Sequence, residues 1–219
     1  MDVRFFDRTN KRKRRDLIDE DFEAQMSSAS AIFSYFLSKN LVTNKAKQIN
    51  VFCDAEIESF NLQNTVIDQI WDVEVPFNPN EMLAIENMKD KITAIRNLLG
   101  KIFIPIFSAE KWDSEILERA LESASNVDFR YERLLPGTPK KSPDKKHTVI
   151  VKCVEDIFNF KMICYVYDRK GMLCLKKQLI ETWPSVFVYN RFLGKLSWLN
   201  NSEFEIKSKT SQWKSIVKI

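Results

Sequence analysis

The sequence predicts an α+β protein whose helical, acidic N-terminal portion precedes an antiparallel β-meander or curled sheet. Three observations predict this fold class. Apolar residues recur every three or four positions in several segments before residue 136, as in amphipathic helices. Segment 136–146 is rich in proline and lysine, a composition that neither helix nor strand tolerates. After it, apolar and polar residues alternate with period two, which is typical of half-buried strands.

Three helices are expected in the N-terminal portion. The first spans Asp16 to Lys39, where acidic residues crowd the first turns and favour the positive end of the helix dipole. Its core-facing residues are Ile18, Phe22, Met26, Ala29, Phe33 and Phe36. The second helix is capped by Asn78, which a first-turn proline follows, and it ends at Gly100. The third spans Ser108 to Ser123.

Strands are expected between and after these helices. In the N-terminal portion they lie at 49–53, 73–77 and 102–107. In the C-terminal portion they lie at 158–167, 172–180, 186–189, 195–198, 204–207 and 212–217. Turn residues separate them at 168–171, 200–202 and 209–211, so the last eighty residues or so read as a meander.

This pattern divides the chain into four parts. Residues 1–15 form a basic N-terminal arm, and 16–135 an acidic, mainly helical portion with short strands. Residues 136–146 form a Pro/Lys-rich loop, and 147–219 an antiparallel β portion. Residues 16–219 are also compatible with a single domain, because a chain of this length buries about 70% of its unfolded surface.

Charge is strongly segregated along the chain. The net charge of +4 is the sum of +5 in residues 1–15, −10 in 16–135 and +9 in 136–219. Such blocks orient and accelerate encounters with a charged partner, but they specify no chemistry.

The expected location is the cytoplasm, or the nucleus if the source is eukaryotic or viral. The N-terminus has no apolar run of secretory type, and the longest apolar run, Ile102 to Phe107, is too short to span a bilayer. Four irregularly spaced cysteines, Cys53, Cys153, Cys164 and Cys174, are therefore expected to be reduced thiols.

No catalytic residue, cofactor or metal site is expected, and the chain is predicted not to be an enzyme. A nucleophile would need His147, the one histidine, as its base, and no G-x-S-x-G elbow accompanies it. The cysteines lack zinc-site spacing. Four glycines in the whole chain provide no phosphate-binding loop.

Three alternating acids, Asp54, Glu56 and Glu58, would share one face of a strand. A solvated strand face is the favoured interpretation. The alternative is a hard-cation site, which would make the protein a metal-dependent hydrolase.

Five consecutive cations are a local signal for nucleic-acid or anionic-surface binding. They are Lys11, Arg12, Lys13, Arg14 and Arg15, and Lys140, Lys141, Lys145 and Lys146 would extend that surface. A solvated arm preceding an acidic helix is favoured instead, because the acidic block would repel a polyanion.

The C-terminal third resembles the strand-turn-strand endings of bacterial immunity proteins from polymorphic-toxin systems. The resemblance runs from Phe158-x-Phe160 through Asp168-Arg-Lys-Gly171 and Gly194-Lys-x-x-Trp198 to Trp213. It implies a cytoplasmic, non-enzymatic protein that neutralises one cognate toxin by binding it.

The leading expectation is therefore a protein-binding module, most concretely an immunity-type inhibitor of a toxin or enzyme. A basic protein partner would dock on acidic residues, namely Asp16, Asp19, Glu20, Asp21, Glu23, Asp54, Glu56 and Glu58. The alternative is a nucleic-acid binder that uses the basic arm. No membrane span is expected.

Overall fold

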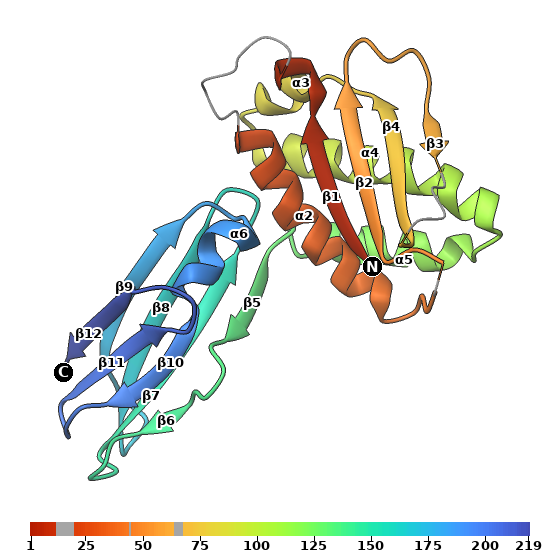
Figure 1. The fold of residues 1–219 in the computed structure, drawn as a ribbon. Coiled ribbons are helices and arrows are strands. Elements are labelled where there is room, and N and C mark those ends of the chain that lie inside the picture. The colour runs from red at the N-terminus through yellow and green to blue at the C-terminus, as the bar shows by residue number, and fades with distance from the viewer. Residues whose placement is uncertain (12–19, 44, 64–67) are drawn as a thin grey trace. The chain divides into compact units, whose positions relative to one another are not determined.

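The computed structural model describes residues 1–11, 20–43, 45–63 and 68–219 (Figure 1). It confirms the α+β class. The chain divides into two compact units, unit 1 (Met1–Arg130) and unit 2 (Tyr131–Ile219), each with its own sheet structure.

Unit 1 is a mixed α/β unit, so the expectation of a mainly helical portion is wrong. Its four-stranded sheet has the order β1-β2-β4-β3. The strands are β1 (Asp2–Asp7), β2 (Gln48–Asp54), β3 (Asn61–Gln63) and β4 (Ile70–Pro76). β1, β2 and β4 are parallel, and β3 is antiparallel to β4. Parallel pairing requires a crossover connection, and the helix between β1 and β2 supplies the first one.

Helices cover one face of this sheet (Figure 1). They are α2 (Glu20–Ser38), α4 (Met88–Glu110) and α5 (Ser114–Asn126), while the short helices α1 (Arg8–Lys11) and α3 (Pro79–Leu83) follow β1 and β4 in the chain. Alternate strand residues point into the core beneath them. These are Val3, Phe5, Ile49, Val51, Trp71, Val73 and Val75, all buried.

The first expected helix is confirmed where it is described. α2 buries Phe22, Met26, Ala29 and Phe33 on one side, while Phe36 is only half-buried. Asp16, Ile18 and Asp19 lie outside the described residues.

The second and third expected helices begin and end differently in the structure. Asn78 does cap a helix, since its side chain accepts a hydrogen bond from the Asn80 backbone N–H. That helix is the short α3, and α4 begins afresh with Asn87 as its own cap. α4 then passes through Gly100 to Glu110, so the predicted strand at 102–107 is wrong. α5 begins after the cap residue Asp113.

The period of burial explains the error at 102–107. Ile102, Phe103, Ile106 and Phe107 are buried, which is the three- and four-residue spacing of a helix. α4 is also long and apolar enough, by length and composition, to cross a membrane, and half of its most apolar stretch is buried. A core helix shows the same two properties.

The expectation of a basic N-terminal arm is wrong for residues 2–11, which form the strand β1 and the short helix α1. Val3 and Phe5 are each 4% exposed on β1, which pairs along its whole length with β2. Because alternate apolar residues fill the core, this segment is an integral strand. Arg12 to Arg15 lie outside the described residues.

Unit 2 consists of two antiparallel sheets packed face to face, not one curled sheet. The first sheet contains β5 (Tyr131–Leu134), β6 (Lys140–Lys141), β7 (His147–Glu155), β8 (Phe160–Asp168) and β9 (Leu173–Thr182). The second contains β10 (Gly194–Trp198), β11 (Glu203–Ser208) and β12 (Lys214–Lys218). We call them sheet B and sheet C.

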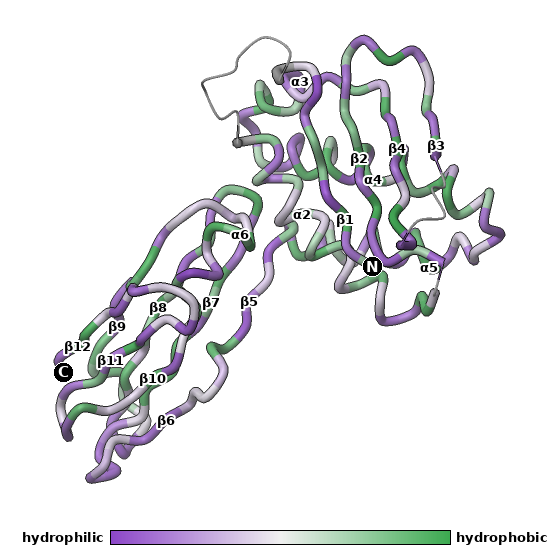
Figure 2. Tube along the Cα trace, in the orientation of Figure 1, coloured by the Kyte–Doolittle hydropathy of each residue, from purple (hydrophilic) through white to green (hydrophobic). Residues whose placement is uncertain are grey.

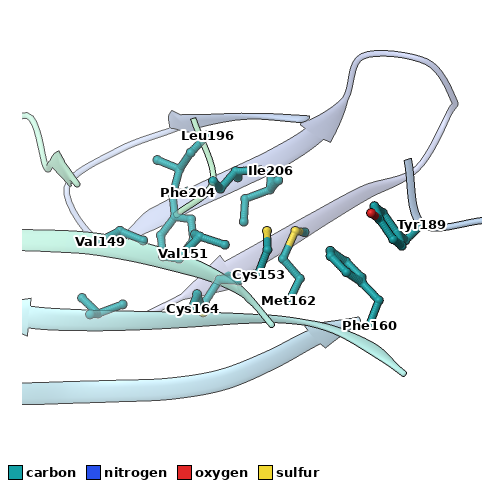
Figure 3. Packing of buried hydrophobic residues seen from close by; sticks show 13 residues of the cluster. Val149, Val151, Cys153, Phe160, Met162, Cys164, Tyr189, Leu196, Phe204 and Ile206 are labelled. Atoms are coloured by element: carbon teal, nitrogen blue, oxygen red, sulfur yellow. The ribbon is translucent and has the colours of Figure 1, made fainter. Parts of the chain in front are cut away.

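Side chains from both sheets meet in one core, shown in Figure 3. Val151, Met162 and Cys164 of sheet B pack with Leu196 and Phe204 of sheet C. The predicted strand at 186–189 is instead the short helix α6 (Val186–Tyr189), followed by the 3₁₀ turn Asn190–Phe192. Figure 2 shows hydropathy alternating along most strands of both units.

Candidate functional site

The three alternating acids do not share a strand face. β2 ends at Asp54, Glu56 lies in the turn that follows, and Glu58 lies in irregular chain beyond it. Asp54 is 1% exposed, and its Oδ1 accepts a hydrogen bond from the Glu56 backbone N–H at 3.0 Å. The expected alternation is therefore wrong, because the chain turns immediately after Asp54. The hydrogen bond to the Asp54 side chain stabilises that turn.

Three further acids of the expected docking face, Glu20, Asp21 and Glu23, lie at the start of α2. Asp16 and Asp19 lie outside the described residues. Glu23 accepts a hydrogen bond from the Asp7 backbone N–H at 3.0 Å. Partner binding by the acidic residues stays a prediction. Glu56 and Glu58 are exposed and therefore accessible to a partner.

Sequence reasoning missed a buried group at the carboxyl end of β1 and β2. Asp7 and Cys53 are Cα partners and are both almost fully buried. Burial raises the pKa of the Cys53 thiol, and the nearby Asp7 carboxylate raises it further. A thiol held neutral in this way is a poor nucleophile. The pair is therefore better explained as part of the packed core than as a reactive site.

The second face of the sheet in unit 1 is polar and internally paired. Phe6 stacks on Phe52 with 5.1 Å between ring centroids, and the Arg8 guanidinium lies 3.9 Å above the Phe52 ring. Arg8 also contacts Glu74 at 2.8 Å. These partners satisfy the charges locally, which is typical of a solvated sheet face.

The basic residues expected to bind nucleic acid fall in both units, and Arg12 to Arg15 lie outside the described residues. Lys11 ends α1. The Lys140 ammonium donates to the Leu196 carbonyl at 2.8 Å, and Lys146 lies 3.6 Å from an Asp144 oxygen. Lys141 and Lys145 are exposed. Lys140 and Lys141 form β6, so segment 136–146 is not wholly a loop, and Lys140 and Lys146 have structural contacts.

The outer face of sheet B carries apolar side chains where polar ones are expected. Val149, Val151, Met162, Cys164 and Val166 point into the core, so the residues between them face outward. The outward apolar and aromatic residues at the centre of β7 and β8 are Ile150, Ile163, Tyr165 and Tyr167, all partly exposed, and the Cα partner of Ile163 on the same face is Lys152. We call the four apolar and aromatic residues the tyrosine surface.

Strand pairing makes the tyrosine surface contiguous. Ile150 and Tyr165 are Cα partners, and Tyr167 pairs with Leu173 of β9. Leu173 is 52% exposed, and Leu134 of β5 is 46% exposed. Exposed apolar side chains therefore extend across four neighbouring strands.

Charged residues border the tyrosine surface, and several of them have ionic or aromatic partners. The ammonium groups of Lys152 and Lys176 lie 5.8 and 5.7 Å from the centroid of the Tyr165 ring. Lys161 contacts Glu181 at 3.1 Å and, with Gln178, lowers the pKa of that carboxyl. An apolar, aromatic centre inside a charged rim is the anatomy of a protein interface.

A sequence signal for this surface exists. Residues 149–151 and 162–167 are unbroken apolar or aromatic runs, and strands buried on both faces show such runs. The signal is easily missed because β8 is preceded and begun by a true apolar-polar alternation, in which Asn159 and Lys161 are the polar residues.

The described residues hold no group of three or more His, Cys, Asp or Glu placed to bind a metal ion. His147 begins β7 and donates its backbone N–H to the Ser142 hydroxyl at 3.0 Å. Comparisons with family models, curated proteins and solved structures found no match for this chain.

Proposed function

We propose that this chain is a protein-binding module without catalysis of its own, and that a partner protein docks on the tyrosine surface. Its most concrete form is an immunity-type inhibitor that neutralises a toxin or another enzyme by direct binding. One observation carries the proposal: the two central strands of sheet B expose Ile150, Ile163, Tyr165 and Tyr167 on their solvent face.

Energetics favour a partner at this face. An antiparallel sheet that packs one face on a core normally presents polar residues on the other. Burying apolar side chains stabilises a complex by roughly 25 cal/mol per Å² of apolar area removed from water. Tyrosine loses little side-chain entropy on ordering, so aromatic anchors held by strands are well suited to a binding hot spot.

The resemblance to immunity proteins supports the choice of partner. It covers the segment from Phe158 to Trp213, which contains β8 and β9 and thus most of the tyrosine surface. The first partner to test is accordingly the polypeptide encoded by the adjacent reading frame.

The test compares two matched lysine substitutions by calorimetric titration of the full chain with that polypeptide. Ile163→Lys places a charge in the tyrosine surface. Ile216→Lys makes the same change at a 46% exposed position on the solvent face of sheet C. Ile163→Lys should weaken binding at least about tenfold, since a central anchor contributes about 1.4 kcal/mol or more, and Ile216→Lys should leave binding unchanged.

Three results would overturn the proposal. They are the absence of any complex with the adjacent product, equal losses in both variants, and a wild-type homodimer that only Ile163→Lys dissociates. The last would assign the surface to a second copy of the chain. Thermal unfolding of both variants checks that each remains folded.

A further inference from the structure

A row of three lysines crosses the solvent face of sheet C. Lys195 of β10 is the Cα partner of Lys207 of β11, which is the partner of Lys214 of β12. Partners in an antiparallel sheet point to the same side, and all three residues are exposed. We call them the lysine row.

The lysine row is electrostatically unfavourable within the fold. Like charges directly opposite each other destabilise a sheet. Within the described part of the chain, no ion pair compensates any of the three. Elsewhere on the same face, Glu203 is the partner of Lys218. Opposite charges therefore do face each other at another position of this sheet.

Protection of sheet edges explains only part of the row. Lysines on edge strands discourage edge-to-edge aggregation, which accounts for Lys195 on β10 and Lys214 on β12. Lys207 is on the central strand β11, where that explanation fails. Lys207 has a lysine partner on each side, and a negatively charged ligand would compensate these like charges.

Two more cations lie at the same end of sheet C. Lys209 is in the turn between β11 and β12, and its backbone N–H donates to the Leu193 carbonyl at 3.3 Å. The Ser211 hydroxyl donates to the Arg191 carbonyl at 2.6 Å, which holds the exposed Arg191 beside this turn. The basic patch therefore extends beyond the row.

We propose that the lysine row binds the phosphate backbone of double-stranded nucleic acid without reading its sequence. Strands about 4.8 Å apart make the row about 10 Å long, which is the axial length of about three nucleotides of one strand. The neighbouring outward side chains, Ser197, Glu205 and Ile216, include no aromatic ring, so the face lacks the stacking platform that single strands use. Lysines are depleted in protein interfaces, so the observations favour a polyanion over a protein.

Fluorescence anisotropy tests the proposal with the full chain and a duplex of about 20 base pairs at about 50 and about 200 mM salt. The triple variant Lys195→Gln, Lys207→Gln, Lys214→Gln should lose at least about tenfold in affinity at low salt. Its plot of log affinity against log salt should be shallower by about 2 to 3, since each phosphate contact contributes about 0.9.

The matched control is Lys89→Gln, Lys170→Gln, Lys177→Gln, which changes net charge equally at exposed positions outside the row. It should keep most of the affinity. Both variants retain Lys11 to Arg15, so any binding by that run is common to them. Ile163→Lys should leave duplex binding unchanged, which separates this site from the proposed protein-binding surface.

Four outcomes would overturn the inference. They are no duplex binding by the wild type at low salt, equal losses in the row variant and the control, tighter binding of single strands, and row-dependent binding of vesicles with anionic lipids in place of the duplex.

Discussion

Cys174 differs from the other three cysteines in exposure, and this difference determines reactivity. Cys53, Cys153 and Cys164 are buried free thiols, and Cys174 is an exposed free thiol. Burial raises the pKa of Cys153 to about 11 and also raises the pKa of Cys164. The thiolate is the reactive form, so burial limits both access and ionisation.

We expect an alkylating reagent at about pH 8 to label Cys174 alone in the native protein. Peptide mass spectrometry before and after denaturation measures this, and all four cysteines should be labelled once the chain unfolds. Rapid native labelling of Cys53 would contradict the burial of its strand.

Lys207 links stability to the inferred binding site. Replacing it with glutamate creates two opposite-charge pairs, with Lys195 and Lys214. Each cross-strand pair contributes about 0.2 to 1 kcal/mol, and solvent screening favours the low end. Lys207→Glu should therefore raise the free energy of unfolding while weakening duplex binding.

Urea denaturation checks the sign of this effect. Lys170→Glu, in the turn after β8, makes the same charge change outside the lysine row and should alter stability little. A lower free energy of unfolding for Lys207→Glu than for the wild type would show that the row is not strained.

At the scale of elements, β1 is one of several strands that the sequence did not predict, together with β3, β5, β6 and β7. Its apolar residues Val3 and Phe5 lie among charged neighbours, which made residues 1–15 resemble an arm. Phe5 contacts Phe22 of α2 edge to face, with 6.3 Å between ring centroids, and pairs with Val51 of β2. β1 therefore connects the sheet to α2.

Phe5→Ala should lower the free energy of unfolding by about 3 to 5 kcal/mol, the usual cost of removing a buried phenyl ring. Arg4→Ala is the control on the same strand. Its ion pair with Asp2 is about half exposed on both sides, so its loss should cost less than about 1 kcal/mol. Denaturant titrations measure both variants. If Phe5→Ala lowered the free energy of unfolding as little as Arg4→Ala does, β1 would not be part of the folded unit.

Local patterns predicted the elements whose signals are local. The side-chain cap at Asn78, the apolar stripe of α2 and the hairpin turns of unit 2 are all encoded within a few residues. The helix over 102–107 was missed because Ile and Phe favour strands and Pro105 is unfavourable inside a helix, whereas packing against the sheet selects the helical period.

Pairing across long distances was not predictable in the same way. The parallel neighbours β1, β2 and β4 come from separated segments, and the split of the last strands into sheets B and C depends on a shared core. The tyrosine surface follows from that split, because only the packing shows which face of β8 is outward.

For the whole molecule, charge follows the two units. Unit 1 carries 17 Lys/Arg against 22 Asp/Glu, and unit 2 carries 17 against 8. Both proposed surfaces belong to unit 2, on the solvent faces of its two sheets. Because those faces lie on opposite sides of one core, a protein and a nucleic acid would not compete for the same residues.

The two units have separate cores that should unfold independently. The core of unit 2 is made only of residues between Leu135 and Ile219, whereas Phe33 of unit 1 packs on Phe103 with 4.9 Å between ring centroids. Phe204→Ala should destabilise unit 2 by about 3 to 5 kcal/mol, and Phe33→Ala should do the same to unit 1. Hydrogen exchange read by mass spectrometry resolves the two, because local unfolding proceeds through separate cooperative segments. Each variant should speed exchange in its own unit alone, and an equal rise in both units would instead show that the chain unfolds as one cooperative body.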